Sequence, residues 1–169
     1  TWEWYKEKLE RPKKLNDLLY LIGRDRFVER FVKNPSVQFT DSEELLLEIE
    51  EKRIQTYINR KAEEMWRTTL KGKDREYQIG VVFADQCISQ VGNRLAEDNP
   101  DLDFICIFNI PKSISLRGIK DDIHLGKDVA ELFEGGGGHP KASGIPINSE
   151  EVKRLILKFI NDVFEVKRK

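Results

Sequence analysis

The amino-acid sequence predicts an α/β fold, in which a mixed sheet of about four or five strands is flanked by helices. Two apolar runs of strand length, residues 79–83 and 104–108, enclose a helical pattern at residues 89–97. The order strand, helix, strand predicts a right-handed parallel crossover. A long connecting helix and a small helical segment are expected to precede the sheet.

The N-terminal part of the chain has the periodicity of helices. Leucines recur at helical spacing within residues 15–22, and Asn34-Pro35-Ser36 is a stop signal. Thr40-Asp41-Ser42-Glu43 then has the form of a capping box. The helix that it opens is predicted to run to about Leu70, with Met65 and Trp66 on its apolar face.

The period changes at Tyr77, where the sheet is expected to begin. After the strand at 104–108, a short turn predicts an antiparallel hairpin with a strand at 113–117. A further strand is expected at 143–147, and Asn148 or Ser149 is expected to cap a final helix. The predicted domains are a helical remnant at 1–40, a connecting helix at 41–74 and a substrate-binding domain at 75–169.

Composition limits the classes of function. The 169 residues carry a formal net charge of −1, so affinity for a polyanion must come from a local patch. Cys87 and Cys106 form no Cys-x-x-Cys pair and are interpreted as reduced thiols, which favours the cytoplasm. No apolar run approaches 18 residues, so no membrane partner is expected.

The most informative motif is a run of four glycines, Gly135, Gly136, Gly137 and Gly138, followed by His139-Pro140-Lys141. Glycine backbone can turn its N–H groups toward an anion, most often a phosphate. His139 and Lys141 then stand beside the glycines as donors, although a turn histidine and a solvated lysine are the alternatives. The run therefore predicts a phosphate-binding loop.

Other polar residues are candidates for the same site. Arg117 ends a strand whose alternation puts it on one face with Ser113 and Ser115, and its guanidinium can grip a phosphate. Ser89 and Asn93 lie at the start of the crossover helix, where anions are favoured, although a polar cap is the alternative.

Two phenylalanines and one histidine are not counted among the candidate site residues. Phe83 and Phe108 could stack a base, but they are interpreted as core residues because they stand in apolar strands. His124 lacks a motif around it and is interpreted as a surface residue.

The glycine run with His139 and Lys141-Ala142-Ser143-Gly144 resembles the signature of the C-terminal substrate-binding domain of DHH-family phosphoesterases. That family includes RecJ-like exonucleases, oligoribonucleases and cyclic-dinucleotide phosphodiesterases. The resemblance covers roughly residues 77–165, including a strand that ends at Arg117 and a short helix at 128–133. Trp2 and Trp4 resemble, more weakly, the segment that follows the partner domain's last metal-binding aspartate.

The resemblance implies a catalytic half with two metal ions, Mn²⁺ or Mg²⁺, held by aspartates and an Asp-His-His triplet. No such triplet occurs here, and Asp121-Asp122-Ile123-His124 has the wrong order. The chain is therefore expected to be a fragment that contains no cofactor or metal site and is inactive alone.

The resemblance implies a substrate-binding role for this chain, with a catalytic DHH domain of the same polypeptide as its partner. The expected substrate is a short single-stranded RNA or DNA, or a nucleotide, whose phosphodiester bonds the whole enzyme hydrolyses. Alternatives are a non-catalytic module that senses a nucleotide or cyclic dinucleotide, and a tRNA-contacting module similar to that of alanyl-tRNA synthetase. The choice of RNA or DNA, the direction of degradation and a homodimeric state stay open.

Overall fold

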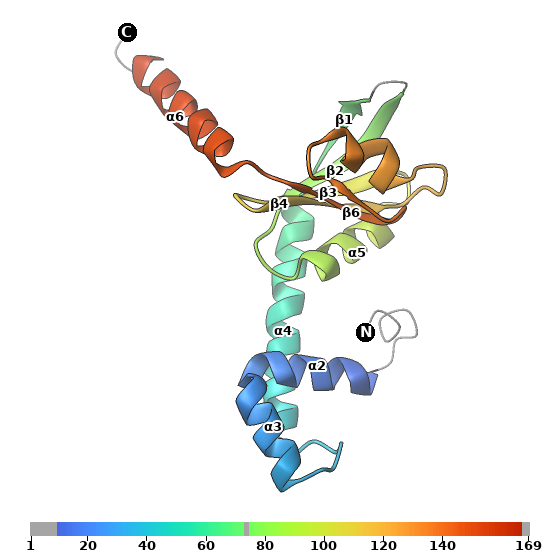
Figure 1. The fold of residues 1–169 in the computed structure, drawn as a ribbon, viewed down its shortest axis with the longest axis vertical. Coiled ribbons are helices and arrows are strands. Elements are labelled where there is room, and N and C mark those ends of the chain that lie inside the picture. The colour runs from blue at the N-terminus through green and yellow to red at the C-terminus, as the bar shows by residue number, and fades with distance from the viewer. Residues whose placement is uncertain (1–9, 73–74, 167–169) are drawn as a thin grey trace. The chain divides into compact units, whose positions relative to one another are not determined.

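The structure of the chain is a computed structural model that describes residues 10–72 and 75–166 (Figure 1). Trp2 and Trp4 lie outside the described residues. The chain divides into two compact units, Thr1–Thr56 and Tyr57–Lys169. The predicted domain boundaries stay a prediction.

The first unit is helical. Its helices are α2 (Glu10–Ile22), α3 (Arg24–Lys33) and the first part of α4 (Asp41–Glu64). Leu18 and Leu47 are buried, at 0% and 6% exposure. The capping box is confirmed, since the Thr40 N–H donates to Glu43 Oε2 at 2.8 Å and the Glu43 N–H donates to Thr40 Oγ1 at 3.3 Å.

Arg30 links α3 to the start of α4. Its Nε donates to Glu43 Oε1 at 2.9 Å, and its Nη2 donates to the Gln38 carbonyl at 2.6 Å. The hydrogen bond from Arg30 lowers the pKa of Glu43. One guanidinium therefore fixes both the loop and the capping residue that begins α4.

The second unit is built on a mixed sheet of six strands in the order β1-β2-β3-β4-β6-β5. The strands are β1 (Trp66–Lys71), β2 (Glu76–Phe83), β3 (Phe104–Asn109), β4 (Ser113–Gly118), β5 (Gly137–Gly138) and β6 (Ala142–Pro146). β2 and β3 pair in parallel around helix α5 (Ile88–Asp98), and the other pairs are antiparallel. The α/β class is confirmed, with slightly more strands than expected.

The prediction that the connecting helix runs to Leu70 is wrong. α4 ends at Glu64, and Trp66–Lys71 is a strand that pairs with β2. Every residue of β1 is exposed. Its sequence therefore lacks the alternation of apolar and polar residues by which a half-buried strand is predicted. Its aromatic and threonine residues fit the pleat of a sheet, and pairing with β2 decides the conformation.

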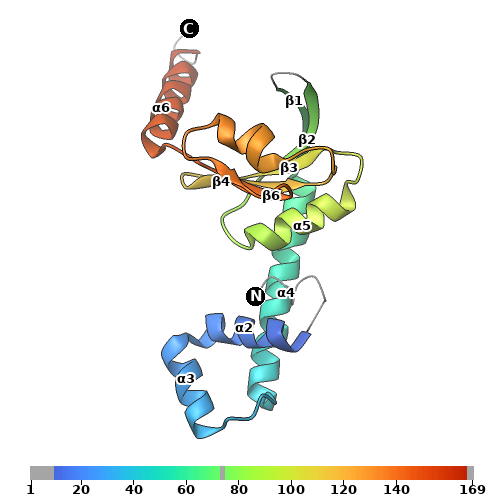
Figure 2. The same ribbon diagram turned by 45° about the vertical axis from the view of Figure 1, so that its right-hand side comes forward.

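The two faces of the sheet are covered by different elements. α5 packs on one face, and the π-helical turn η1 (Leu125–Val129) and the 3₁₀ turn η2 (Ala130–Leu132) lie on the other (Figure 2). A cluster of buried apolar residues lies on the η face and includes Phe104, Cys106 and Leu116. Burial raises the pKa of the Cys106 thiol to about 12.

Phe83 is not a core residue, contrary to the prediction. It is the last residue of β2 and is 49% exposed, whereas Phe108 is half-buried against the core cluster. The two rings still touch, with centroids 5.7 Å apart. An apolar run in the sequence predicts a buried strand, but it does not predict at which residue of the strand the burial ends.

The last helix is α6 (Ser149–Val166), and the predicted cap is confirmed, since Asn148 Oδ1 accepts from the Glu150 N–H at 3.0 Å. Leu155 and Phe159 are 63% and 69% exposed. No helix in the described part of the chain is long and apolar enough to cross a membrane.

Three glycines stand where two stretches of backbone approach closely. A Cβ on Gly136 would lie 2.0 Å from the Ala130 carbonyl oxygen, and one on Gly126 would lie 2.3 Å from the Gly138 carbonyl oxygen. Gly138 also has a φ of +142°. By contrast, a Cβ on Gly137 meets nothing within 4 Å.

We predict opposite outcomes for two neighbouring glycines. Gly136→Ala forces a side chain against the η2 backbone and should destabilise the chain by about 1–3 kcal/mol, the usual cost of overpacking. Gly137→Ala should leave stability within about 0.5 kcal/mol of the parent, as surface substitutions do. Thermal melts of both variants measure this, and equal melting temperatures for the two would contradict the close packing of η2 on the glycine segment.

Candidate functional site

Arg117 lies in β4, where it pairs with Ile105 of β3 and Ala142 of β6. Successive side chains of a strand alternate between faces, so the buried Leu116 faces the η side and Arg117 the α5 side. Arg117 Nη2 donates to Ser89 Oγ at 3.0 Å, and Nη1 donates to the Leu116 carbonyl at 3.0 Å. The predicted arginine and the predicted helix-start serine are therefore in direct contact.

Gly92 makes room for the stem of this arginine. A Cβ at position 92 would lie 2.6 Å from Arg117 Cγ and 2.7 Å from Ile107 Cδ1. α5 therefore rests directly on the arginine side chain. This role of Gly92 was not predicted from the sequence, in which an isolated glycine inside a helical pattern is the available signal.

The guanidinium comes to the N-terminal end of α5, since Ser89 stands in the first turn. N–H groups at a helix start carry partial positive charge. Cys87, the residue before the helix, has a left-handed φ of 50°, and its side chain does not cap the helix. Asn93 lies one turn beyond Ser89 and so shares its helix face. The Arg117 guanidinium and the start of α5 together form an electropositive site, which we call the Arg117 corner.

The Ala84–Cys87 loop that leads into α5 is held by Tyr57. The Tyr57 hydroxyl donates to Asp85 Oδ1 at 2.7 Å and accepts from the Asp85 N–H at 3.1 Å. Burial and the bond to Asp85 raise the pKa of Tyr57, and the same bond lowers the pKa of Asp85. The end of α4 therefore positions the loop from which α5 starts.

His139 and Arg117 are close in the register of the sheet. The His139 N–H donates to the Ala142 carbonyl at 2.8 Å, which closes the turn between β5 and β6. Ala142 in turn pairs with Arg117. The backbone of His139 is therefore joined to that of Arg117 through Ala142.

Beside this row lies a strip that is almost free of side chains. Ser115 pairs with Gly144, and Gly144 pairs with Gly137. A Cβ on Gly144 would come no closer than 3.9 Å to another atom, and one on Gly137 would meet none within 4 Å. In this strip the backbone of Gly144 and Gly137 is not covered by side chains. The space at Gly137 also accommodates a ligand atom as readily as a side chain.

Lys141 has structural partners. Its Nζ donates to the carbonyls of Ile119 and Lys120, both at 2.9 Å, and pairs with Asp121 Oδ1 at 2.6 Å. The ammonium therefore fixes the 119–121 loop, and its contact with a substrate stays a prediction. His124 caps η1, because its Nδ1 accepts from the Lys127 N–H at 3.2 Å.

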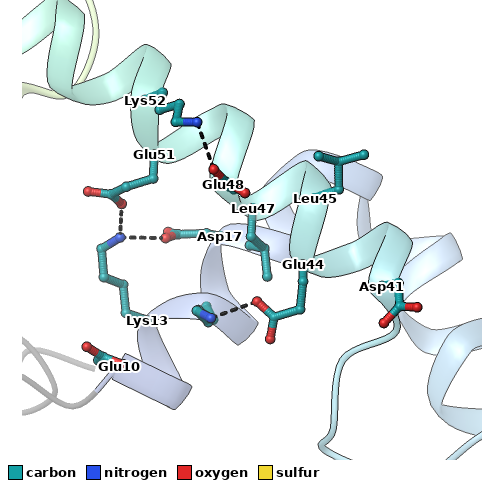
Figure 3. Close-up of a pocket in the computed structure, with 11 residues that line it drawn as sticks. Glu10, Lys13, Asp17, Asp41, Glu44, Leu45, Leu47, Glu48, Glu51 and Lys52 are labelled. Carbon is teal, nitrogen blue, oxygen red and sulfur yellow. Dashed lines mark hydrogen bonds and ion pairs between the residues drawn. The ribbon is translucent and has the colours of Figure 1, made fainter.

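The predicted site residues line neither of two hollows found among the described residues. One hollow, of about 940 Å³, lies in the first unit between α2 and α4 (Figure 3). Its charged side chains pair with one another, as Lys14 does with Glu44 at 2.7 Å and Lys52 with Glu48 at 2.7 Å. Among the described residues, no group of three or more His, Cys, Asp or Glu is placed to hold a metal ion.

Comparison with known proteins adds one informative match. The chain is 39% identical over 173 aligned positions to oligoribonuclease NrnB of Bacillus subtilis, a match that covers 98% of this chain and 40% of that protein. No family model matches. A crystal structure of an uncharacterized protein from Helicobacter pylori is 21% identical with a TM-score of 0.38, covering 91% of this chain and 45% of that one.

The contact between Gly92 and Arg117 predicts an energetic coupling. Gly92→Ala should destabilise the chain, because its methyl group collides with the arginine stem. The same substitution in an Arg117→Ala background should cost less, with a coupling energy of about 0.5–3 kcal/mol. Urea denaturation of the four proteins in this cycle measures the coupling. Strict additivity would show that α5 does not rest on the arginine.

Proposed function

We propose that this chain, which resembles the substrate-binding domain of DHH-family phosphoesterases, is the substrate-binding part of such an enzyme. The 39% identity to an oligoribonuclease supports this proposal. The whole enzyme hydrolyses phosphodiester bonds of short single-stranded oligonucleotides. The chain spans 40% of the length of the curated relative, so we infer a catalytic domain elsewhere in the same polypeptide.

The observation that carries this proposal is the corner formed by Arg117 and the start of α5. The Arg117 guanidinium is held at Ser89, so its position is fixed before a ligand arrives. A phosphate there would receive charge-assisted hydrogen bonds and would also meet the positive end of α5. We assign Arg117 and Ser89 to the phosphate, and Asn93 to a neighbouring oxygen.

The side-chain-free strip supports an end-on substrate. Gly137 and Gly144 allow a sugar or a base to lie against the backbone, and His139 can donate to a phosphate or a ribose hydroxyl. The net charge of −1 supports a short ligand rather than a long duplex, since few phosphates are neutralised. We also infer a cytoplasmic protein, in keeping with Cys87 and Cys106, which form no disulfide.

The metal ions of the family do not fit the residues described in this chain, which offer no cluster of suitable ligands. In our proposal the metals belong to the catalytic domain, and this chain binds and orients the substrate.

We predict that Arg117→Ala weakens binding of a 5′-phosphorylated dinucleotide by about 10- to 150-fold. This range corresponds to 1.5–3 kcal/mol, the usual value of a hydrogen bond to a charged group. Titration calorimetry with wild type and variant measures the change, with thermal melts to confirm that both are folded.

Arg94→Ala is the matched control. Arg94 stands on the same helix, is exposed and pairs with Asp98 at 2.6 Å. The control should bind as wild type does. If Arg117→Ala also binds like wild type, the proposed phosphate site is wrong.

A second prediction concerns the chemistry. The purified chain should cleave no oligoribonucleotide, with or without Mn²⁺, because its sequence lacks the Asp-His-His triplet of the family. The assay follows 5′-labelled di- to pentanucleotides on denaturing gels. Metal-dependent turnover that survives removal of contaminating nucleases would place the catalytic groups in this chain and refute the division of roles.

A further inference from the structure

A second hollow, separate from Arg117, lies where β2 and β3 end. It has a volume of about 200 Å³ and is lined by Lys61, Phe83, Ala84, Asp85, Phe108 and Ile110. We call it the aromatic pocket. None of the functional assignments above uses it.

The rings of Phe83 and Phe108 form its apolar wall, with Phe83 exposed and Phe108 half-buried, and the ring of Trp66 lies beside Phe83. Phe83 is 49% exposed, its ring centroid lies 5.7 Å from that of Phe108, and Trp66 follows at 5.4 Å from Phe83. Trp66 and Ile110 are themselves 43% and 45% exposed. The exposed ring of Phe83 offers a flat face on which a planar group can stack.

The rim carries one cation and one anion in fixed positions. The Lys61 side chain is only 12% exposed and pairs with Glu64 at 2.5 Å. Asp85 is held by the Tyr57 hydroxyl at 2.7 Å. A planar group in the pocket thus meets a donor and an acceptor at its edge, as the polar edge of a nucleobase requires.

The pocket and the Arg117 corner are joined by one short loop. Phe83, Phe108 and Ile114 form a cross-strand row on the η face, whereas Arg117 lies on the α5 face. The loop from Ala84 to Cys87 leads from the pocket to Ser89, which contacts Arg117. Both sites therefore adjoin the end of the sheet where α5 begins.

We propose that the aromatic pocket binds one nucleobase of the oligonucleotide whose phosphate is bound at Arg117, with the base stacked on Phe83. The volume of about 200 Å³ is enough for a single base. This inference rests on the proposed function, and it adds a base subsite that would favour oligonucleotides over inorganic phosphate or sugar phosphates.

The test compares two probes that differ only in the base. One is the 5′-phosphorylated dinucleotide pApA, and the other is its analogue with an abasic second residue. Phe83→Ala should weaken binding of pApA by about 5- to 100-fold, the range for loss of one stacked base. Binding of the abasic analogue should stay within twofold of wild type.

Two further variants make the outcome decisive. Phe83→Leu keeps an apolar side chain without a ring, and should lose the same preference for pApA even if Phe83→Ala fails to fold. Phe133→Ala removes an exposed ring outside the pocket, 52% exposed in the structure, and should bind both probes like wild type.

Trp66 gives an independent readout. In a background with Trp2→Phe and Trp4→Phe, pApA should quench the remaining tryptophan emission, and the abasic analogue should not. Unchanged emission at saturating pApA, or equal losses for both probes in Phe83→Leu, would overturn the base subsite and leave the exposed rings to a protein contact. Failure of the proposed function is distinct, since Arg117→Ala would then bind both probes normally.

Discussion

The arrangement of the second unit depends on two stretches of backbone that come too close to admit a side chain between them. η1 and η2 rest on the glycine segment, with Gly126 against the Gly138 carbonyl and Gly136 against the Ala130 carbonyl. The turn that follows is tied on both sides, by hydrogen bonds from Leu125 to Pro140 and from Gly118 to Lys141. These contacts hold the strand β5 against the sheet. Its pairing with β6 covers only two residues and is too short to hold it alone.

The same constraint gives the glycines two different purposes. Gly126, Gly136 and Gly138 are required by packing within the chain, whereas Gly137 borders open space together with Gly144. A run of four glycines thus combines a structural part with a part that is available to a ligand. Arg117, on the opposite face, likewise has a packed part and a polar part. Gly92 of α5 packs on its aliphatic stem, and Ser89 accepts a hydrogen bond from its guanidinium.

Much of the fold could be predicted from the sequence. The parallel pair β2 and β3 with its crossover helix, the hairpin to β4 and the capping box at Thr40 all follow from local patterns. β1 could not be predicted, because its residues are exposed throughout and its conformation comes from pairing with β2. The exposure of Phe83 also depends on where η1 and η2 end, which no local pattern encodes. For the site, the pattern indicated Arg117 and Ser89 separately, but their contact depends on Gly92, a residue that carries no chemistry.

The packing of α5 on the Arg117 side chain also affects how this domain can evolve. Replacing a glycine inside a helix by alanine normally stabilises a protein, because alanine has the higher helix propensity. Here that substitution is blocked as long as a long side chain runs beneath position 92. In a set of related sequences, alanine or a larger residue at this position should therefore appear together with a shorter residue at position 117, and a lineage that makes both changes gains a more stable helix by giving up its arginine.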